Sequence, residues 1–170
     1  PYLFVFDFVW FVYRPAAIIS SSLCNQVENR HTGTSANNQI TIPATGTGYT
    51  IDWEEVGNPA NNGSEVGNGS HTVTFPSVGT YEISISGGTF SAITFNGGGD
   101  RRKILSIEAW GNIPWSTMED AFHGCTNLVG NALDTADVSA VTDMSSAFED
   151  ASAFNQNMQG WDVSNVTNMG

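Results

Sequence analysis

Three carboxylates lie close together in the first half of the sequence, at Asp52, Glu54 and Glu55. Paired carboxylates can do general acid and base chemistry when they are held at a fixed separation. Side chains of neighbouring residues in a strand point to opposite faces, so Glu54 and Glu55 are expected to diverge. A calcium site would need six or more converging oxygens, and no loop here has that pattern. We therefore expect a solvated strand edge and no catalytic residues.

Histidine and cysteine do not form a recognisable metal or nucleophile motif. His31, His71 and His123 are scattered, and Cys24 and Cys125 have no zinc spacing. Whether the two cysteines pair is left open, although Cys125 falls on an apolar repeat position that favours a buried thiol. No metal or cofactor is expected.

The charge balance argues against nucleic-acid binding. The net charge is −12, with 5 Lys and Arg against 17 Asp and Glu, whereas phosphate backbones are bound by cations. The one basic cluster, Arg101–Lys103, follows three glycines and is predicted to be a solvated turn.

Residues 37–109 have the pattern of a small β-sandwich. Short alternating runs are separated by turn residues, as half-buried strands are, while residues 57–70 are rich in Gly and Asn and are predicted to be a loop. The predicted strands cover residues 39–43, 49–53, 71–75, 80–86, 89–95 and 104–107.

Several motifs of this region resemble polycystic-kidney-disease (PKD) domains, which have an Ig-like sandwich fold. A strand ending in Trp53, a His-Thr-aromatic strand ending in Phe75, and Gly79-Thr80-Tyr81 occur in the family's order. The usual Trp-Gly-Asp-Gly turn is absent, because Trp53 is followed by Glu-Glu-Val. The resemblance implies a sandwich core that contains Trp53, Phe75, Tyr81 and Ile83.

The C-terminal part, residues 110–170, repeats with a period of about 25. Met118, Met144 and Met169 are separated by 26 and 25 positions, and Asp-Val-Ser-x-Val-Thr recurs from Asp137 and from Asp162. Such a period is typical of leucine-rich-repeat solenoids, in which each coil buries its edge against the next. The predicted repeat core consists of Met118, Phe122, Cys125, Leu128, Val138, Val141, Met144, Phe148, Ala151, Phe154, Val163, Val166 and Met169.

These repeats resemble BspA-type leucine-rich-repeat surface proteins. The shared motifs are Asp-Val-Ser-Asn-Val-Thr-Asn-Met, Ala-Phe-x-x-Ala-x-x-Phe-Asn-Gln and Trp-Asp-Val-Ser. The first copy departs from the pattern, with Ile113-Pro114-Trp115 in place of Val-Ser-x-Val. The resemblance implies a cell-surface or secreted, non-enzymatic module for adhesion or protein interaction, with a protein or matrix partner and possibly a glycan.

An alternative function is a carbohydrate-binding accessory region, which would need exposed aromatic rings. Trp110 and Trp161 lie near repeat boundaries, where stacking between coils is the favoured interpretation. If Trp53 and Tyr81 are buried, the sandwich offers no such platform.

Residues 1–36 are predicted to be a signal or linker segment, or the product of a frameshift. Residues 2–13 are apolar except for Asp7, a run too short to span a membrane. A lipoprotein-type cleavage site at Cys24 is a further possibility. Because there is no initiator Met and the third repeat stops at Gly170, we expect a fragment of an extracellular protein.

Overall fold

A computed structural model describes residues 23–28 and 32–170. The described chain is mostly β, and its one helical element is the short 3-10 turn η1 (Arg101–Lys103). Mostly-β structure agrees with the prediction from the sequence. The strands are β1 (Leu23–Glu28), β2 (Gln39–Ile42), β3 (Ala44–Thr45), β4 (Thr47–Glu55), β5 (Asn58–Asn68), β6 (His71–Thr74), β7 (Thr80–Ser86), β8 (Ala92–Ile93), β9 (Ile104–Ala109) and β10 (Val129–Gly130).

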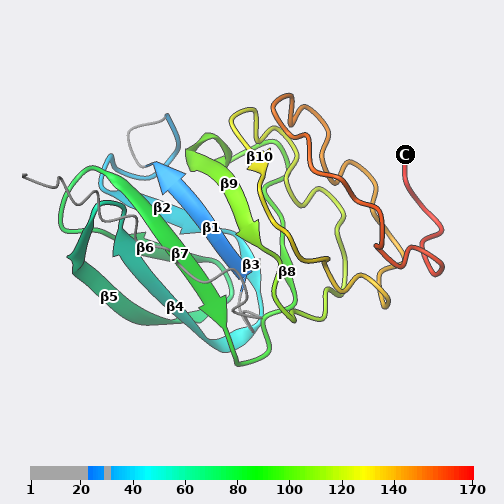
Figure 1. Ribbon diagram of the computed structural model, residues 1–170, viewed down its shortest axis with the longest axis horizontal. Coiled ribbons are helices and arrows are strands. Elements are labelled where there is room, and N and C mark those ends of the chain that lie inside the picture. The colour runs from blue at the N-terminus through cyan, green and yellow to red at the C-terminus, as the bar shows by residue number, and fades with distance from the viewer. Residues whose placement is uncertain (1–22, 29–31) are drawn as a thin grey trace, which may run out of the picture.

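Six of these strands form one sheet in the order β10-β9-β1-β7-β4-β5. Neighbours are antiparallel except β10, which runs parallel to β9. Two small antiparallel sheets, β2-β6 and β3-β8, complete the β-structure. The sheets lie at one end of the molecule, and the C-terminal chain winds away from them to the opposite end (Figure 1).

An aromatic cluster packs the six-stranded sheet against β2-β6. Phe75, directly after β6, stacks on Tyr81 of β7 with ring centroids 4.0 Å apart and meets the edge of Trp53 at 5.5 Å. Phe75, Tyr81 and Ile83 are at most 1% exposed and Trp53 is 9% exposed. The alternation along β4 and β7 accounts for this packing, since every second residue faces the same side.

The prediction of a loop over residues 57–70 is wrong, because β5 occupies most of it. Gly63 and Gly67 of β5 pair with Trp53 and Tyr49 of β4. A Cβ added to Gly63 would lie 2.4 Å from the Trp53 ring, and one added to Gly67 would lie 2.1 Å from the Tyr49 ring. These glycines therefore leave room for the aromatic rings of Trp53 and Tyr49, which cross beneath the strand. Glycine-rich composition alone predicts a loop, because it does not show that a side chain would clash here.

Strand β1 lies within residues 1–36, the segment expected to be a leader or linker. It pairs with β7 on one side and with β9 on the other, and its Val27 is 1% exposed. The rest of that expectation, on residues 1–22 and 29–31, falls outside the described residues.

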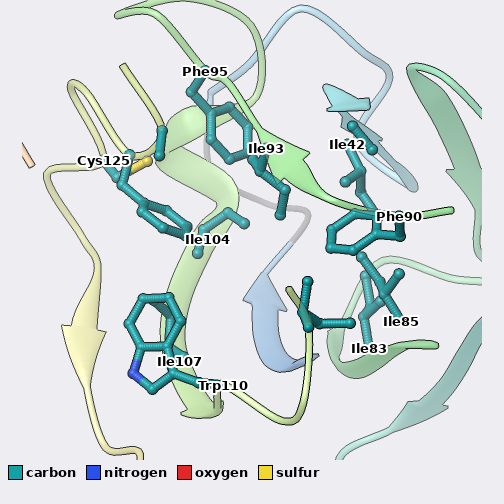
Figure 2. Packing of buried hydrophobic residues seen from close by; sticks show 14 of the residues in the cluster. Ile42, Ile83, Ile85, Phe90, Ile93, Phe95, Ile104, Ile107, Trp110 and Cys125 are labelled. Atoms are coloured by element: carbon teal, nitrogen blue, oxygen red, sulfur yellow. The ribbon is translucent and has the colours of Figure 1, made fainter. Parts of the chain in front are cut away.

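One hydrophobic core continues from the sheets into the C-terminal chain. Phe90 contacts Trp115 with ring centroids 6.3 Å apart, and Trp115 contacts Trp110 at 5.9 Å. Figure 2 shows this continuity, with Ile83, Ile85 and Phe90 at one side, Ile93 and Ile104 between, and Ile107, Trp110 and Cys125 at the other. The predicted boundary at residue 110 thus runs through a packed core.

Candidate interaction surface

The carboxylates considered for catalysis do not share one site. Asp52 and Glu54 line an open hollow of about 400 Å³ on the outer face of the six-stranded sheet, together with Glu82. The Glu55 carboxylate instead accepts hydrogen bonds from Asn58 at 3.0 Å and Asn61 at 2.8 Å. The divergence of Glu54 and Glu55 follows from the pleat of β4.

The histidines and the cysteine of the described chain also stay apart. His71 lies 2.8 Å from Glu65, while His123 lies 3.1 Å from Asp120 and 4.0 Å from Glu149. Among the described residues, no three His, Cys, Asp or Glu side chains are placed to hold a metal ion.

Cys125 is a free, fully buried thiol and therefore does not pair with Cys24. Burial raises the pKa of the Cys125 thiol to about 12, against a smaller lowering by Arg101. It packs as a small apolar side chain.

The C-terminal chain winds in stacked turns, which we call coils: coil 1 is residues 90–114, coil 2 is 115–140, coil 3 is 141–165, and 166–170 begin coil 4. Backbone hydrogen bonds join coil 2 to coil 3, and one constant sequence offset separates each donor from its acceptor. The N–H groups of alternate residues in coil 2 donate to carbonyls of coil 3 in four pairs: Met118 to Asp143, Asp120 to Ser145, Phe122 to Ala147 and Gly124 to Glu149. The repeat period is therefore the period of the stacking.

Further backbone hydrogen bonds, with donors on both sides of each junction, join coil 1 to coil 2 and coil 3 to coil 4. Ser116 N–H donates to Ser91 O in coil 1, and Met144 N–H donates to Asn168 O at the start of coil 4. Stacking thus begins upstream of residue 110, at a coil that the sequence analysis assigned to the sandwich. The only repeat signal there is Ser91, which lies one repeat period before Ser116.

Aspartates with a serine two residues later shape the bends of coils 2 and 3. Asp143 Oδ1 accepts hydrogen bonds from the Ser145 hydroxyl at 2.5 Å and the Ser145 N–H at 2.8 Å. These bonds hold the pKa of Asp143 below its ordinary value, and Ser164 does the same for the pKa of Asp162. Asx turns of this kind satisfy backbone groups that a short coil cannot pair.

The predicted repeat core divides by its position in the stack. Its members in coil 2, together with Val141, are fully buried: Met118, Phe122, Cys125, Leu128, Val138 and Val141. In coil 3, Met144 and Ala151 are buried, whereas Phe148 and Phe154 are partly buried and stack on each other at 4.2 Å. At the end of the described stack, Val163 and Met169 are 41% and 67% exposed, and Val166 is partly buried.

Trp110, Trp115 and Trp161 lie inside the stack. Trp110 and Trp161 meet edge to face with ring centroids 5.0 Å apart, and both are buried. Among the described residues, every Trp and Tyr is buried. No flat aromatic platform is therefore exposed on this part of the chain.

The basic cluster contains a residue that the sequence analysis misjudged. Arg102 is exposed, but Lys103 is fully buried. The Lys103 ammonium donates to four acceptors on the segment 35–39, at 2.7 to 3.2 Å: Ser35 O, Ser35 Oγ, Ala36 O and Gln39 O. The three glycines before the cluster favoured the prediction of a solvated turn. No local pattern near Lys103 indicates that its acceptors lie in residues 35–39, far away along the chain.

Asp100 completes this buried group, which we call the clasp. Its carboxylate lies 3.6 Å from Lys103 Nζ and accepts hydrogen bonds from Thr34 N, Ser35 N, Ser35 Oγ and Thr41 N. Burial by itself raises the pKa of Asp100, but the hydrogen bonds from Ser35 and Thr41 and the Lys103 charge together hold it below its ordinary value. The clasp ties coil 1 to the start of β2.

Within residues 23–28 and 32–170, no helix has the length and apolar character needed to cross a membrane.

Residues 94–170 are similar to a family described as "Mycoplasma protein of unknown function, DUF285". The match covers somewhat under half of the chain and coincides with the stacked coils. No curated protein and no solved structure matches the chain.

Proposed function

We propose that this chain is a non-enzymatic cell-surface or secreted module for protein interaction or adhesion, in which a PKD-like β-sandwich caps a leucine-rich-repeat-like solenoid. The observation that carries the proposal is the ladder of backbone hydrogen bonds between coils at the repeat spacing. Chains built from stacked coils present an extended surface, and such surfaces bind macromolecules rather than small molecules. The BspA-type resemblance of the repeats and the similarity of residues 94–170 to a Mycoplasma family support a bacterial surface protein.

The charge and the exposed side chains favour a protein partner. A net charge of −12 disfavours nucleic acids and anionic lipid surfaces. Exposed coplanar aromatic rings would favour a glycan, but the described Trp and Tyr side chains are buried. The carbohydrate-binding alternative therefore has less support than protein binding.

Binding of the purified chain to a panel of extracellular-matrix proteins, measured by surface plasmon resonance beside a glycan array, tests this function. We expect saturable binding to at least one protein. Leu133→Lys, at a coil side chain that is 95% exposed, should weaken it, whereas Val78→Lys, at an apolar side chain of the sandwich that is 47% exposed, should not. Binding to glycans alone would favour the alternative, and no binding to either would refute the proposal.

A further inference from the structure

Strand β5 is the last strand of the six-stranded sheet, at the margin farthest from β10 (Figure 1). It pairs with β4 on one side, and no other described strand pairs with its second side. Its neighbours along the chain, β4 and β6, are both described, and neither fills that second side. An edge strand of this kind presents backbone N–H and C=O groups with which another extended chain can pair.

The register of the sheet identifies the groups on this edge. Val56 N–H donates to Thr80 O of β7, and the backbone groups of successive residues in a strand point alternately to its two sides. Every second residue of β5 therefore bonds to β4, namely Gly63, Glu65 and Gly67. The residues between and before them direct their N–H and C=O groups away from β4: Asn62, Ser64 and Val66. These backbone groups, which we call the free edge, have no hydrogen-bond partner among the described residues.

The free edge lacks the features that usually keep other strands away. Pro and Lys, which commonly block edge-to-edge pairing, are missing from residues 60–68. The three side chains beside the free edge are uncharged and exposed, and Val66 is 61% exposed. The free edge is therefore suited to pairing with a further strand.

An acidic hollow adjoins the free edge on the outer face of the sheet. It has a volume of about 400 Å³, and the side chains around it come from β5, β4 and β7: Asn62, Ser64, Asp52, Glu54, Glu82 and Ser84. Asp52 is opposite Ser64 on one side and Ser84 on the other, so small side chains flank its carboxylate.

The geometry of strand addition places partner side chains at this hollow. A residue paired with Ser64 would have its side chain on the outer face, two strand spacings or about 10 Å from Asp52. The long side chain of Lys or Arg can cross the small Ser64 to reach the Asp52 carboxylate, whereas a short side chain cannot. Alternate residues of the added strand lie on this face, so basic residues should occur at every second position.

Charge selects between a second copy of this chain and a different partner. Pairing of two β5 edges would bring together the Asp52 carboxylates of two chains that each have a net charge of −12. Like charges across an interface repel, whereas a basic segment would be attracted.

We propose that the free edge docks an extended segment of a partner protein in which Lys or Arg alternates with small β-forming residues. The segment adds to the sheet through backbone hydrogen bonds to Asn62, Ser64 and Val66, and its basic side chains lie over the hollow at Asp52. This surface belongs to the sandwich and goes beyond the coil surface of the proposed function.

The probe is the acetylated and amidated peptide Thr-Lys-Thr-Lys-Thr-Lys-Thr, titrated into the full chain by calorimetry. We expect saturable binding that weakens at high salt, because screening reduces attraction between exposed charges. The peptide Lys-Lys-Lys-Thr-Thr-Thr-Thr keeps the charge but loses the alternation, and it should bind about tenfold more weakly or worse. Amide exchange of Asn62, Ser64 and Val66, followed by NMR, should slow in the complex because their N–H groups become hydrogen-bonded.

N-methylated peptides separate strand addition from simple charge attraction. One peptide is methylated at the backbone nitrogens of its Lys residues, and the other at those of its Thr residues. Because only one side of an added strand faces the free edge, one peptide should lose binding and the other should keep it. Equal binding of these two peptides would overturn the inference.

Variants of the chain locate the site. Ser64→Pro removes a free-edge N–H without removing a bond to β4, and it should weaken binding at least about tenfold, whereas Ser64→Ala should bind normally. Asp52→Asn should weaken binding several-fold, and Asp150→Asn, at an exposed carboxylate of coil 3, is the control with the same change of charge. If Ser64→Pro does not fold, the Asp52 variant and the methylated peptides still decide the question.

Three results would overturn the inference: no saturable binding, equal binding of the alternating and block peptides, or self-association that Ser64→Pro abolishes in the absence of peptide binding. The last result would assign the edge to a second copy. Leu133→Ser should leave peptide binding unchanged, because Leu133 lies on the coils. If the matrix panel binds while the peptide does not, the proposed function stands and this inference fails; the opposite result refutes the proposed function and supports this inference.

Discussion

Removal of the Lys103 ammonium is the sharpest test of how this chain is held together. Lys103→Met keeps most of the buried stem but leaves the Asp100 carboxylate, which is 0% exposed, without its cation. Three backbone carbonyls, those of Ser35, Ala36 and Gln39, also lose a donor. Breaking a buried ion pair on one side typically costs about 3–5 kcal/mol. Because whole domains are stable by about 5–15 kcal/mol, the free energy of unfolding should fall by a large fraction.

Urea unfolding followed by tryptophan fluorescence measures this loss. Arg102→Met removes an exposed charge one residue earlier and should change the free energy of unfolding by less than about 0.5 kcal/mol. The double variant Asp100→Asn with Lys103→Met should be less destabilised than the sum of the single variants, because the uncompensated charge is gone. A Lys103→Met chain as stable as the Arg102→Met control, or strictly additive single variants, would refute the role of the clasp. If Lys103→Met does not fold, the double variant still reports the coupling.

Three further predictions follow from the packing and the charges. Because the pKa of Asp100 is held below its ordinary value in the folded chain, its contribution to stability is complete above about pH 4 and is lost as pH falls through the folded-state pKa; urea midpoints of the wild type and Asp100→Asn between about pH 2 and 7 should converge at the acid end, and a constant gap would contradict this. Gly67→Ala should cost about 1–3 kcal/mol by overpacking against the Tyr49 ring, whereas Ala at the outward-facing Ser64 should be nearly neutral in the same denaturation assay. Phe122→Ala should lower the free energy of unfolding by about 3–5 kcal/mol and Phe154→Ala by clearly less, since only the Phe122 ring is fully buried. Equal losses of stability in thermal unfolding would contradict the view that the cost follows the burial of each ring.

Sequence patterns over a few residues predicted those parts of the fold that depend mainly on neighbouring residues. Alternation along residues 49–53 and 80–86 corresponds to β4 and β7, with Trp53, Tyr81 and Ile83 facing the core. Residues 141–148 of the repeat, by contrast, form turns and an isolated bridge at Asp143, with no regular strand or helix. Asx bonds at Asp143 and the left-handed Ser146, with φ of 52°, satisfy the backbone there without regular structure.

The candidate site was less accessible from the sequence. The stacking of coil 2 on coil 3 depends on which N–H groups of one coil meet carbonyls of the next, and only the folded chain shows this, as in the bond from Phe122 to Ala147.

The sequence alone determined the mostly-β class and the repeat period, because both follow from side-chain alternation and repetition along the chain. Tertiary structure decided the rest. It turned the glycine-rich residues 58–68 into a strand because Trp53 and Tyr49 need the space beneath Gly63 and Gly67. It also buried Lys103, because acceptors 64 to 68 residues away converge on its ammonium. Contacts over such separations leave no local pattern, since their free energy comes from groups that meet only in the folded chain.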